Sequence, residues 1–253
     1  MKPHERQQLI EERIRREGEV TVEVLARDFD VSTETIRRDL AELVETGKAQ
    51  KIHGGARRPR LMVAEGSFNE RQATESPAKI RIGRLLSKAV TPGETLFIDT
   101  GSTTLAAAEF LAAIPGLTIV TNSTRLAERL AISGSTAEVF LLGGRFHGDN
   151  AETVGPETVT QIATYQADRA VISVAAMSSS IGGWDASHEE AQVARAMIDN
   201  SHSLTVLADS TKFGRRAAFK VCEVEAIDLL ITDSRANGSD ITAIKQRGVE
   251  IWQ

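Results

Sequence analysis

The stretch Val31-Ser-Thr-Glu-Thr-Ile-Arg-Arg-Asp-Leu40 has the residue pattern of an amphipathic helix. Ser32 is the expected N-cap, because its hydroxyl can accept a hydrogen bond from the first turn, and Gly47 is the expected stop. The apolar residues recur at i, i+4 and i+7, so one face of this helix is expected to pack against a core. These residues are Ile36, Leu40 and Leu43.

Segments on either side supply the other parts of a helix-turn-helix unit. Residues 20–29 predict a shorter helix, and only residues 30–32 separate it from the first one. Residues 6–16 predict a third helix, and residues 49–56 predict a two-stranded wing with a Gly-Gly turn. The apolar residues expected to pack from the two flanking helices are Leu9, Ile10, Ile14, Val24, Leu25 and Phe29.

Positive charge gathers on the predicted helix and wing. Residues 35–60 contain seven basic and three acidic residues, a net charge of +4, in a chain whose net charge is −5. An exposed arginine pair is usually only solvated, but here charge, helix pairing and turn length all favour binding to DNA. The residues predicted to contact the duplex are Ser32, Thr33, Thr35, Arg37, Arg38, Lys51, His53 and Arg57.

Length and composition predict a second, larger domain. The chain has 253 residues, 41% of them hydrophobic and 26% charged, which is too long for a DNA-binding module alone. The segment Arg57-Arg-Pro-Arg60 predicts the exposed connection after the first domain. No apolar run approaches the roughly 18 residues of a membrane helix, and the charged N-terminus does not resemble a signal peptide. A cytoplasmic location is therefore expected.

From residue 95 onward, short apolar runs alternate with helical segments, a pattern typical of a mostly parallel sheet covered on both faces. Ligands of such sheets bind beyond the carboxyl ends of the strands. The predicted strands are 95–99, 117–121, 138–142, 170–174, 204–209 and 227–232, with 249–252 at an edge. The predicted helices are 79–88, 104–113, 124–133, 157–165, 189–200 and 240–247.

Polar motifs follow several of these strands. In the first, Asp99-Thr-Gly-Ser-Thr-Thr104, Gly101 is expected to permit a tight turn before a helix whose N–H groups, hydroxyls and dipole favour a phosphate. Each motif alone is more often a turn or a cap, but several at one sheet edge predict a site for a phosphorylated, hydroxyl-rich molecule. The predicted effector-binding residues are Asp99, Thr100, Gly101, Ser102, Thr103, Thr104, Thr121, Asn122, Ser123, Gly143, Gly144, Arg145 and Lys212.

The same motifs, in this order, resemble the DeoR-type family of bacterial transcriptional repressors. The resemblance rests on Thr35-Ile-Arg-Arg-Asp-Leu40, His53-Gly-Gly-Ala56, the polar motifs above and Ala208-Asp-Ser-Thr-Lys-Phe-Gly214, and it covers nearly the whole chain. Arg71 and Lys79 also resemble positions that the family carries.

This resemblance implies an α/β protein with an N-terminal winged helix-turn-helix domain and a Rossmann-like, mostly parallel sensor domain similar to ribose-phosphate isomerases. The implied boundaries are 1–57 for the first domain, 58–78 for a linker and 79–253 for the second. The implied function is repression of a carbohydrate-metabolism operon, with double-stranded operator DNA and a phosphorylated sugar as partners. A homodimer or homotetramer is expected, with no cofactor and no membrane partner.

Two other functions compete with this interpretation. A sugar-phosphate isomerase needs a carboxylate base, for which Asp185, Glu189 and Glu190 are candidates. A DNA-binding protein whose second domain only dimerises would leave the polar motifs without a role. The five histidines are scattered and the single cysteine, Cys222, has no disulfide partner, so neither a metal site nor thiol chemistry is expected.

Overall fold

The structure is a computed structural model that describes residues 2–45, 48–59 and 65–253. Two residues used in the sequence predictions, the helix stop Gly47 and the basic Arg60, lie outside the described residues.

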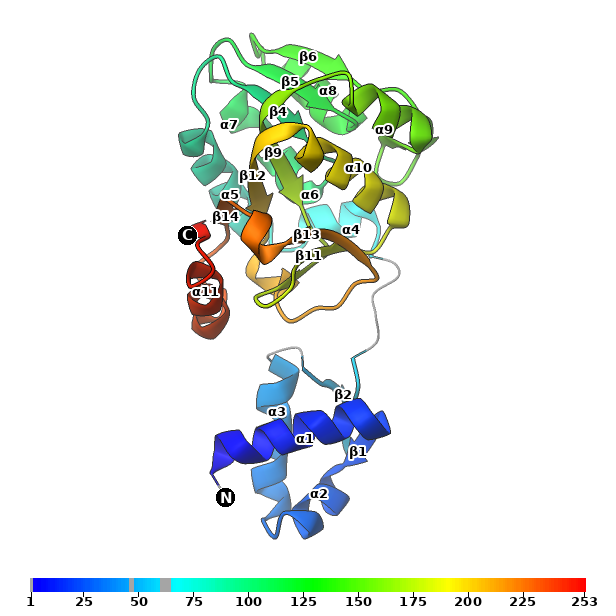
Figure 1. Cartoon of the computed structure of the whole chain (residues 1–253), viewed down its shortest axis with the longest axis vertical. Helices are drawn as coiled ribbons and strands as arrows, with labels where there is room; N and C mark the ends of the chain where they lie inside the picture. The colour runs from blue at the N-terminus through cyan, green and yellow to red at the C-terminus, as the bar shows by residue number, and fades with distance from the viewer. Residues whose placement is uncertain (1, 46–47, 60–64) are drawn as a thin grey trace. The chain divides into compact units, whose positions relative to one another are not determined.

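The chain divides into two compact units (Figure 1). The N-terminal unit comprises Met1–Leu61 and Gly214–Arg216, and the C-terminal unit comprises Met62–Phe213 and Ala217–Gln253. Each unit has its own hydrophobic core. Within the predicted linker of residues 58–78, the structure contains the helix α4 (Phe68–Ala73) and the first turn of α5 (Ser76–Ala89).

The N-terminal unit combines three helices with a small antiparallel sheet of strand order β1-β3-β2. Its elements are α1 (Pro3–Glu17), β1 (Glu19–Thr21), α2 (Val22–Asp28), α3 (Thr33–Glu45), β2 (Gln50–Ile52) and β3 (Gly55–Arg57). The predicted wing is confirmed as β2 and β3. The predicted start of the second helix at residue 20 was wrong, because Val20 and Thr21 belong to β1 and Thr21 is the N-cap of α2. A Cβ at Gly55 would lie 2.0 Å from the carbonyl oxygen of Val20, so this position requires glycine.

The predicted stripe of α3 is confirmed, since Ile36, Leu40 and Leu43 are all buried in the core of this unit. The Ser32 hydroxyl accepts a hydrogen bond from the Thr35 backbone at 3.2 Å, which confirms the N-cap. Leu9 was wrongly placed in the core. It is 44% exposed, because the buried face of α1 is the one that carries Ile10, Ile14 and the aliphatic part of Arg6.

A seven-stranded sheet forms the centre of the C-terminal unit, in the order β15-β14-β12-β9-β4-β5-β6. All its strand pairs are parallel, as the alternation of apolar and helical segments predicted. Its strands are β4 (Thr95–Ile98), β5 (Thr118–Thr121), β6 (Glu138–Leu141), β9 (Ala167–Ser173), β12 (Ser201–Leu207), β14 (Leu229–Ile231) and β15 (Glu250–Trp252). The chain extends the sheet in opposite directions from β4, so loops from both halves meet beyond the carboxyl ends of the central strands.

Helices cover both faces of this sheet; Figure 1 shows α9 and α10 on one side and α5 and α7 on the other. Successive residues of a strand alternate between the two cores: Phe97 packs on the side of α10, and its neighbours Leu96 and Ile98 pack on the side of α5. In α5 the structure buries Ile82 and leaves Ile80 44% exposed. Besides α4 and α5 the helices are α6 (Ser102–Ala106), α7 (Ala108–Leu111), α8 (Thr124–Ile132), α9 (Pro156–Ile162), α10 (His188–Asp199) and α11 (Gly238–Lys245).

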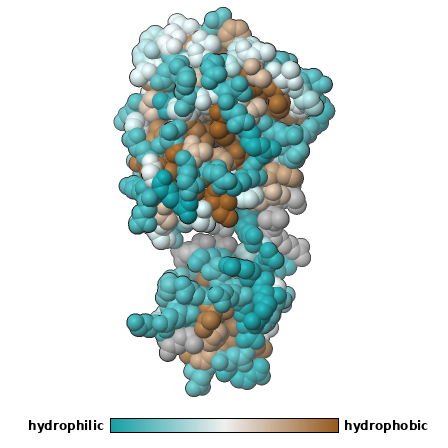
Figure 2. Space-filling view, viewed as in Figure 1, coloured by the Kyte–Doolittle hydropathy of each residue, from teal (hydrophilic) through white to brown (hydrophobic). Residues whose placement is uncertain are grey.

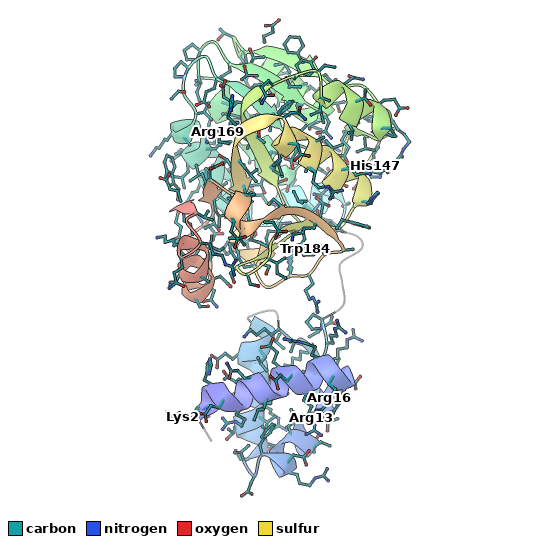
Figure 3. The ribbon with its side chains drawn as sticks, viewed as in Figure 1. Lys2, Arg13, Arg16, His147, Arg169 and Trp184 are labelled. Atoms are coloured by element: carbon teal, nitrogen blue, oxygen red, sulfur yellow. The ribbon has the colours of Figure 1, made fainter. Side chains whose placement is uncertain are left out.

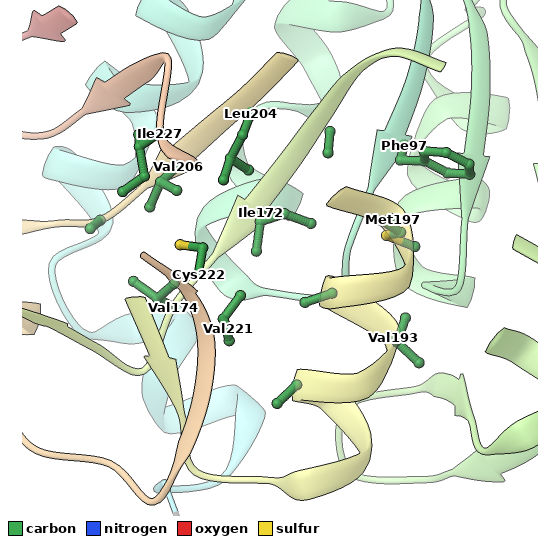
Figure 4. Close-up of a cluster of buried hydrophobic side chains, with 14 of the residues drawn as sticks. Phe97, Ile172, Val174, Val193, Met197, Leu204, Val206, Val221, Cys222 and Ile227 are labelled. Carbon is green, nitrogen blue, oxygen red and sulfur yellow. The ribbon is translucent and has the colours of Figure 1, made fainter. Parts of the chain in front are cut away.

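The core between α10 and the sheet is built mainly from aliphatic side chains (Figure 4). Val193 and Met197 of α10 meet Ile172 of β9 and Val206 of β12 there, and all four are at most 1% exposed. Such dense packing fixes the strand ends and therefore the loops that follow them.

Two smaller sheets lie outside the main sheet of this unit. One is the hairpin of β7 (Arg145–His147) and β8 (Glu152–Val154), and the other has the order β10-β11-β13. The strands of the second are β10 (Ala176–Ser178), β11 (Gly182–Asp185) and β13 (Phe219–Glu223). The sequence predictions missed both, because each strand has only three to five residues.

Hydrophilic side chains cover much of the surface visible in Figure 2, with hydrophobic residues gathered in patches between them. Among the described residues, no helix combines the length and the apolar character needed to cross a membrane.

Candidate DNA-binding and effector-binding sites

The exposed side of α3 carries the two arginines predicted to contact DNA. The side chain of Arg37 is 61% exposed and that of Arg38 is 82% exposed. Thr33 and Ser32 are also exposed, whereas Thr35 is half-buried and its hydroxyl lies 2.9 Å from the hydroxyl of Ser32. The structure therefore leaves Thr33, Arg37 and Arg38 as the side chains of α3 most available to a partner.

Glu34 is the acidic residue closest to these arginines. Its carboxylate lies 3.6 Å from Arg37 Nη1 and 3.9 Å from Arg38 Nε, in pairs whose side chains are all more than half exposed. Exposed pairs of this kind contribute little, about 0–1 kcal/mol. Both arginines can therefore exchange Glu34 for a phosphate or a base edge at small cost.

The predicted wing residues lie on the β2–β3 ribbon. Lys51 and His53 are exposed, and Arg57 is half-buried with its Nε donating to Gln50 Oε1 at 2.9 Å. Arg13 and Arg16, labelled on α1 in Figure 3, both pair with Glu17 at 2.9 and 2.8 Å.

A buried ion pair that the sequence analysis missed links α1 to α3. Arg6 Nε lies 2.6 Å from Asp39 Oδ2, and Arg6 Nη2 donates to Asp39 Oδ1 at 3.3 Å. Gln7 Nε2 also donates to Asp39 Oδ1, at 3.2 Å. Asp39 stands directly after Arg38 but points inward, so it does not reduce the positive charge of the exposed side. A bidentate arginine–carboxylate contact of this geometry fixes the orientation of α3.

Substitution of Asp39 by alanine is expected to destabilise the N-terminal unit by about 3 kcal/mol, because it leaves the Arg6 guanidinium buried without its partner. Both tryptophans, Trp184 and Trp252, lie in the C-terminal unit. Chemical denaturation followed by far-ultraviolet circular dichroism should therefore shift, while the tryptophan fluorescence transition stays in place. The exposed Glu34→Ala variant, as a control on the same helix, should change neither transition by more than about 0.5 kcal/mol. Equal stability of the Asp39 variant would contradict the structural role of the pair.

In the C-terminal unit, the predicted motif after β4 is buried. Asp99 is 7% exposed, and its Oδ2 accepts a hydrogen bond from the Ser173 backbone at 2.9 Å, which links the ends of β4 and β9. Burial raises the pKa of Asp99 well above its usual value. The expected tight turn at Gly101 was wrong, because its φ is −169° and therefore extended. Glycine is needed there for space, since a Cβ would lie 2.0 Å from Ser173 Oγ.

The hydroxyls that follow Gly101 are also enclosed. Ser102, Thr103 and Thr104 are at most 7% exposed, in the first turn of the five-residue helix α6. The Thr104 hydroxyl donates to the carbonyl oxygens of Asp99 and Gly101, at 3.1 and 3.0 Å. Thr104 therefore stabilises its own loop, and its predicted contact with an effector remains a prediction.

A connected set of polar side chains runs across the loops beyond the strand ends; we refer to Lys212, Glu65, Arg71, Asn150, Glu152 and Asn122 as the polar network. Lys212 Nζ lies 2.9 Å from Glu65 Oε1, and Arg71 Nη1 lies 2.9 Å from Glu65 Oε2. Arg71 Nη2 donates to Asn150 Oδ1, and Asn150 Nδ2 donates to Glu152 Oε1 at 2.9 Å. The structure thus brings predicted Lys212 and Asn122 into one site with four residues that were not predicted to bind the effector.

Asn122 lies at the other end of the polar network. Its Nδ2 donates to the Thr153 carbonyl at 2.9 Å and approaches Glu152 Oε2 at 3.4 Å. Its Oδ1 has no hydrogen-bond partner within the described ranges, although the residue is only 1% exposed. An unsatisfied buried acceptor of this kind is costly and suits a hydroxyl or ammonium donor supplied by a ligand. Its neighbours Thr121 and Ser123 are buried too, with Ser123 capping α8.

Three carboxyl groups near the polar network are shifted toward their neutral forms. Burial raises the pKa of Glu190 to about 9, and the nearby carboxylates of Glu152 and Asp185 add to the effect. Burial likewise raises the pKa of Glu152 and of Asp185. With a pKa of about 9, the Glu190 carboxyl is mostly protonated at neutral pH and can both donate and accept a hydrogen bond.

The Gly143-Gly144 turn contacts α9, and Arg145 contacts α10. Gly143 N donates to Gln161 Oε1 at 2.9 Å, and a Cβ at Gly144, whose φ is +144°, would lie 2.1 Å from Thr158 Oγ1. These glycines therefore allow the turn to pack against α9. Arg145 is exposed and pairs with Glu189 at the start of α10. Contact of these residues with an effector remains a prediction.

Metal-ligating residues do not gather in the parts of the chain that the structure describes: no group of three or more suitable side chains is present there. His147, labelled in Figure 3, lies 3.7 Å from Glu152 through Nδ1 and is half exposed. Cys222 is buried, and burial raises the pKa of its thiol to about 11, which makes the thiolate scarce near neutral pH.

Comparisons with known proteins agree with this arrangement. Residues 6–60 match the DeoR-like helix-turn-helix domain, and residues 74–234 match the DeoR C terminal sensor domain. The chain is 32% identical to the glycerol-3-phosphate regulon repressor of Escherichia coli (strain K12) over 234 residues, which cover 92% of each chain. It is 31% identical to the HTH-type transcriptional repressor GlcR of Bacillus subtilis (strain 168), over 94% of this chain and 91% of that protein.

Among solved structures, the chain is similar to the ribose 5-phosphate isomerase A of Methanocaldococcus jannaschii, with a TM-score of 0.39, 14% identity and 55% of each chain covered. The two family matches account for both folded units, and the repressors above are similar over nearly their whole length. The chain therefore belongs to the DeoR family of transcriptional regulators, with a DNA-binding helix-turn-helix domain followed by the C-terminal sensor domain of that family.

Proposed function

We propose that the protein represses a carbohydrate-metabolism operon and that a phosphorylated sugar or polyol modulates its binding to the operator. One observation carries the second half of this proposal: two largely buried cations, Lys212 and Arg71, lie in the same network as the unsatisfied acceptor of Asn122. Cations at one end and hydrogen-bonding groups at the other suit a ligand with an anionic group and several hydroxyls.

The phosphate of the ligand is placed at Lys212 and Arg71, because charge-assisted hydrogen bonds to a phosphate are strong and an arginine can contact it with two N–H groups. We place the hydroxyls of the ligand near Asn122, Glu152 and Asp185. The relatives support this ligand class, since one of them is named as the repressor of a glycerol-3-phosphate regulon.

For the DNA, we infer that two copies of the chain present their α3 helices to neighbouring major grooves, in half-sites about 34 Å apart or a multiple of that distance. Thr33, Arg37 and Arg38 would divide between base edges and phosphates, with arginine best suited to guanine. Lys51 and His53 would contact the backbone from the wing. The assembly would be a homodimer or homotetramer, whose symmetry makes the operator a repeat or a palindrome.

A sugar-phosphate isomerase is the second candidate, and one observation favours it. Asp185 and Glu190 are carboxyl groups near the polar network with raised pKa values, as a catalytic acid or base requires. Glu189, the third residue considered, is instead paired with Arg145 and 40% exposed. The repressor relatives and the attached DNA-binding domain favour regulation over catalysis.

Operator fragments selected from a random duplex library allow both candidates to be tested. Affinity for the selected duplex should be measured by fluorescence anisotropy at one fixed salt concentration, with a panel of sugars and polyols in phosphorylated and unphosphorylated forms. We expect a response only to phosphorylated members, and no conversion of any of them when the mixtures are analysed by NMR. Turnover of a sugar phosphate would favour the isomerase, and a response to unphosphorylated sugars alone would contradict the proposed ligand class.

A further inference from the structure

Glu65 lies between the two cations of the polar network. Its Oε1 is 2.9 Å from Lys212 Nζ and its Oε2 is 2.9 Å from Arg71 Nη1, so each carboxylate oxygen serves one cation. The exposed fraction is 14% for the Glu65 side chain, 12% for Lys212 and 15% for Arg71. One carboxylate thus neutralises two cations that are largely withdrawn from water.

We propose that the Glu65 carboxylate occupies the subsite for the phosphate group of the effector, and that the effector must displace it to bind. This inference rests on the proposed function and specifies how its ligand site is regulated. A phosphate carries nearly two negative charges and three acceptor oxygens, whereas a carboxylate carries one charge and two oxygens. A phosphorylated ligand can therefore compete for the same N–H donors.

Arg71 keeps other contacts that hold it in place once Glu65 leaves. Arg71 Nη2 donates to Asn150, and the helix α4 that carries Arg71 packs against α6. The start of α4 is held separately, because Phe68 N donates to Asp149 Oδ2 at 3.1 Å and Arg125 stacks 4.4 Å from the Phe68 ring. The Arg71 side of the subsite is therefore preorganised for an anion, which reduces the cost of binding.

A third cation adds to the positive charge of this subsite. Lys79 is 3% exposed, and its Nζ donates to the carbonyl oxygens of Arg71 and Thr74 at the end of α4. Burial lowers its pKa; the carboxylates of Asp209 and Glu65 oppose this shift, and the charges of Lys212 and Arg71 add to it. A phosphate that replaces Glu65 is therefore attracted by Lys79 as well as by Lys212 and Arg71.

The position of Glu65 in the chain relates its displacement by the phosphate to the DNA-binding domain. Glu65 stands two residues before Ser67, the N-cap of α4, and six residues after Pro59 at the end of the described part of the DNA-binding domain. Displacement of Glu65 therefore acts on the segment that connects the two domains. Each residue released from the sensor domain lengthens the extended segment between the two domains by at most about 3.5 Å.

The experiment compares the wild type with Glu65→Gln, which keeps the shape of the side chain and removes the charge. Binding of inorganic phosphate, and of the sugar phosphate to which the wild type responds, is measured by isothermal titration calorimetry on the full chain. If Glu65 occupies the subsite in about nine-tenths of the molecules, only about one-tenth of them can bind an anion, which weakens the apparent affinity about tenfold. We therefore expect Glu65→Gln to bind inorganic phosphate and the sugar phosphate about tenfold more tightly than the wild type. The control Glu128→Gln removes the same charge from an exposed position on α8 and should bind like the wild type.

The outcomes separate this inference from the proposed function. If the wild type binds a sugar phosphate and Glu65→Gln binds it equally or more weakly, Glu65 only stabilises the fold, and the inference fails while the proposed function stands. If neither protein binds any phosphorylated ligand, both fail. Should Glu65→Gln not fold, Glu65→Asp, whose shorter side chain reaches the two cations less well, must show the same direction of change.

Discussion

Arg38→Ala is expected to abolish operator binding while leaving effector binding intact. The side chain is 82% exposed on α3 and its contact with Glu34 is weak, so its removal costs the fold little. A bidentate contact between arginine and a base is worth about 1–3 kcal/mol, and a dimer loses it in both half-sites. Affinity for the selected duplex should fall by a factor of roughly 30 to 10⁴, measured by anisotropy at fixed salt.

The matched control is Arg81→Ala, which removes the same charge from an exposed position on α5 of the sensor domain. It should bind operator like the wild type. Duplexes of different sequence also distinguish two possible roles of Arg38. Loss of a base contact relaxes the sequence specificity at one position, whereas loss of a phosphate contact lowers the affinity for all sequences alike. Normal operator binding by Arg38→Ala would mean that α3 is not the recognition helix.

Lys212→Ala is expected to have the opposite phenotype, with normal operator binding and a large loss of effector response. Lys212 follows β12, and its ammonium group, on a side chain 12% exposed, lies 2.9 Å from the Glu65 carboxylate that we propose a phosphate displaces. Removal of a charged hydrogen bond costs about 1.5–3 kcal/mol, which corresponds to a 10- to 150-fold weaker binding of the sugar phosphate. Calorimetry measures this loss directly.

The charge-matched control for this position is Lys245→Ala on α11, a helix on which no predicted or observed member of the polar network lies. It should keep the wild-type affinity for the sugar phosphate. An unchanged affinity in Lys212→Ala would remove Lys212 from the ligand site and move the phosphate to another part of the sensor domain.

The elements of this fold with a repeated local pattern could be predicted from the sequence. The i, i+4, i+7 spacing of Ile36, Leu40 and Leu43 predicted the helix α3, and Ser32 was predicted as its N-cap. The seven parallel strands were predicted because each is a short apolar run between helical segments. Local patterns of this kind predict structure correctly because the tertiary fold buries the same faces of the helices and strands that the patterns mark as apolar.

The contacts between distant residues could not be predicted. Glu65 and Lys212 are 147 residues apart, and Arg71 and Asn150 are 79 apart, so no spacing rule relates them. The ion pair of Arg6 and Asp39, which are 33 residues apart, could not be predicted for the same reason. Glycine was predicted to be necessary at position 101, but for a tight turn. The actual reason, its close approach to Ser173, depends on the pairing of β4 with β9, which no local pattern shows.

The central claim is that ligand binding in the sensor domain and operator binding in the helix-turn-helix domain are energetically coupled. Linkage makes this coupling reciprocal: the factor by which the sugar phosphate changes operator affinity must equal the factor by which operator changes sugar-phosphate affinity. The decisive measurement is a titration of the protein with the sugar phosphate, without and with saturating operator, at one salt concentration. We predict that the dissociation constant of the sugar phosphate differs by roughly 5- to 150-fold between the titrations without and with operator. Identical constants in the two titrations would show that the two domains act independently and would contradict the central claim.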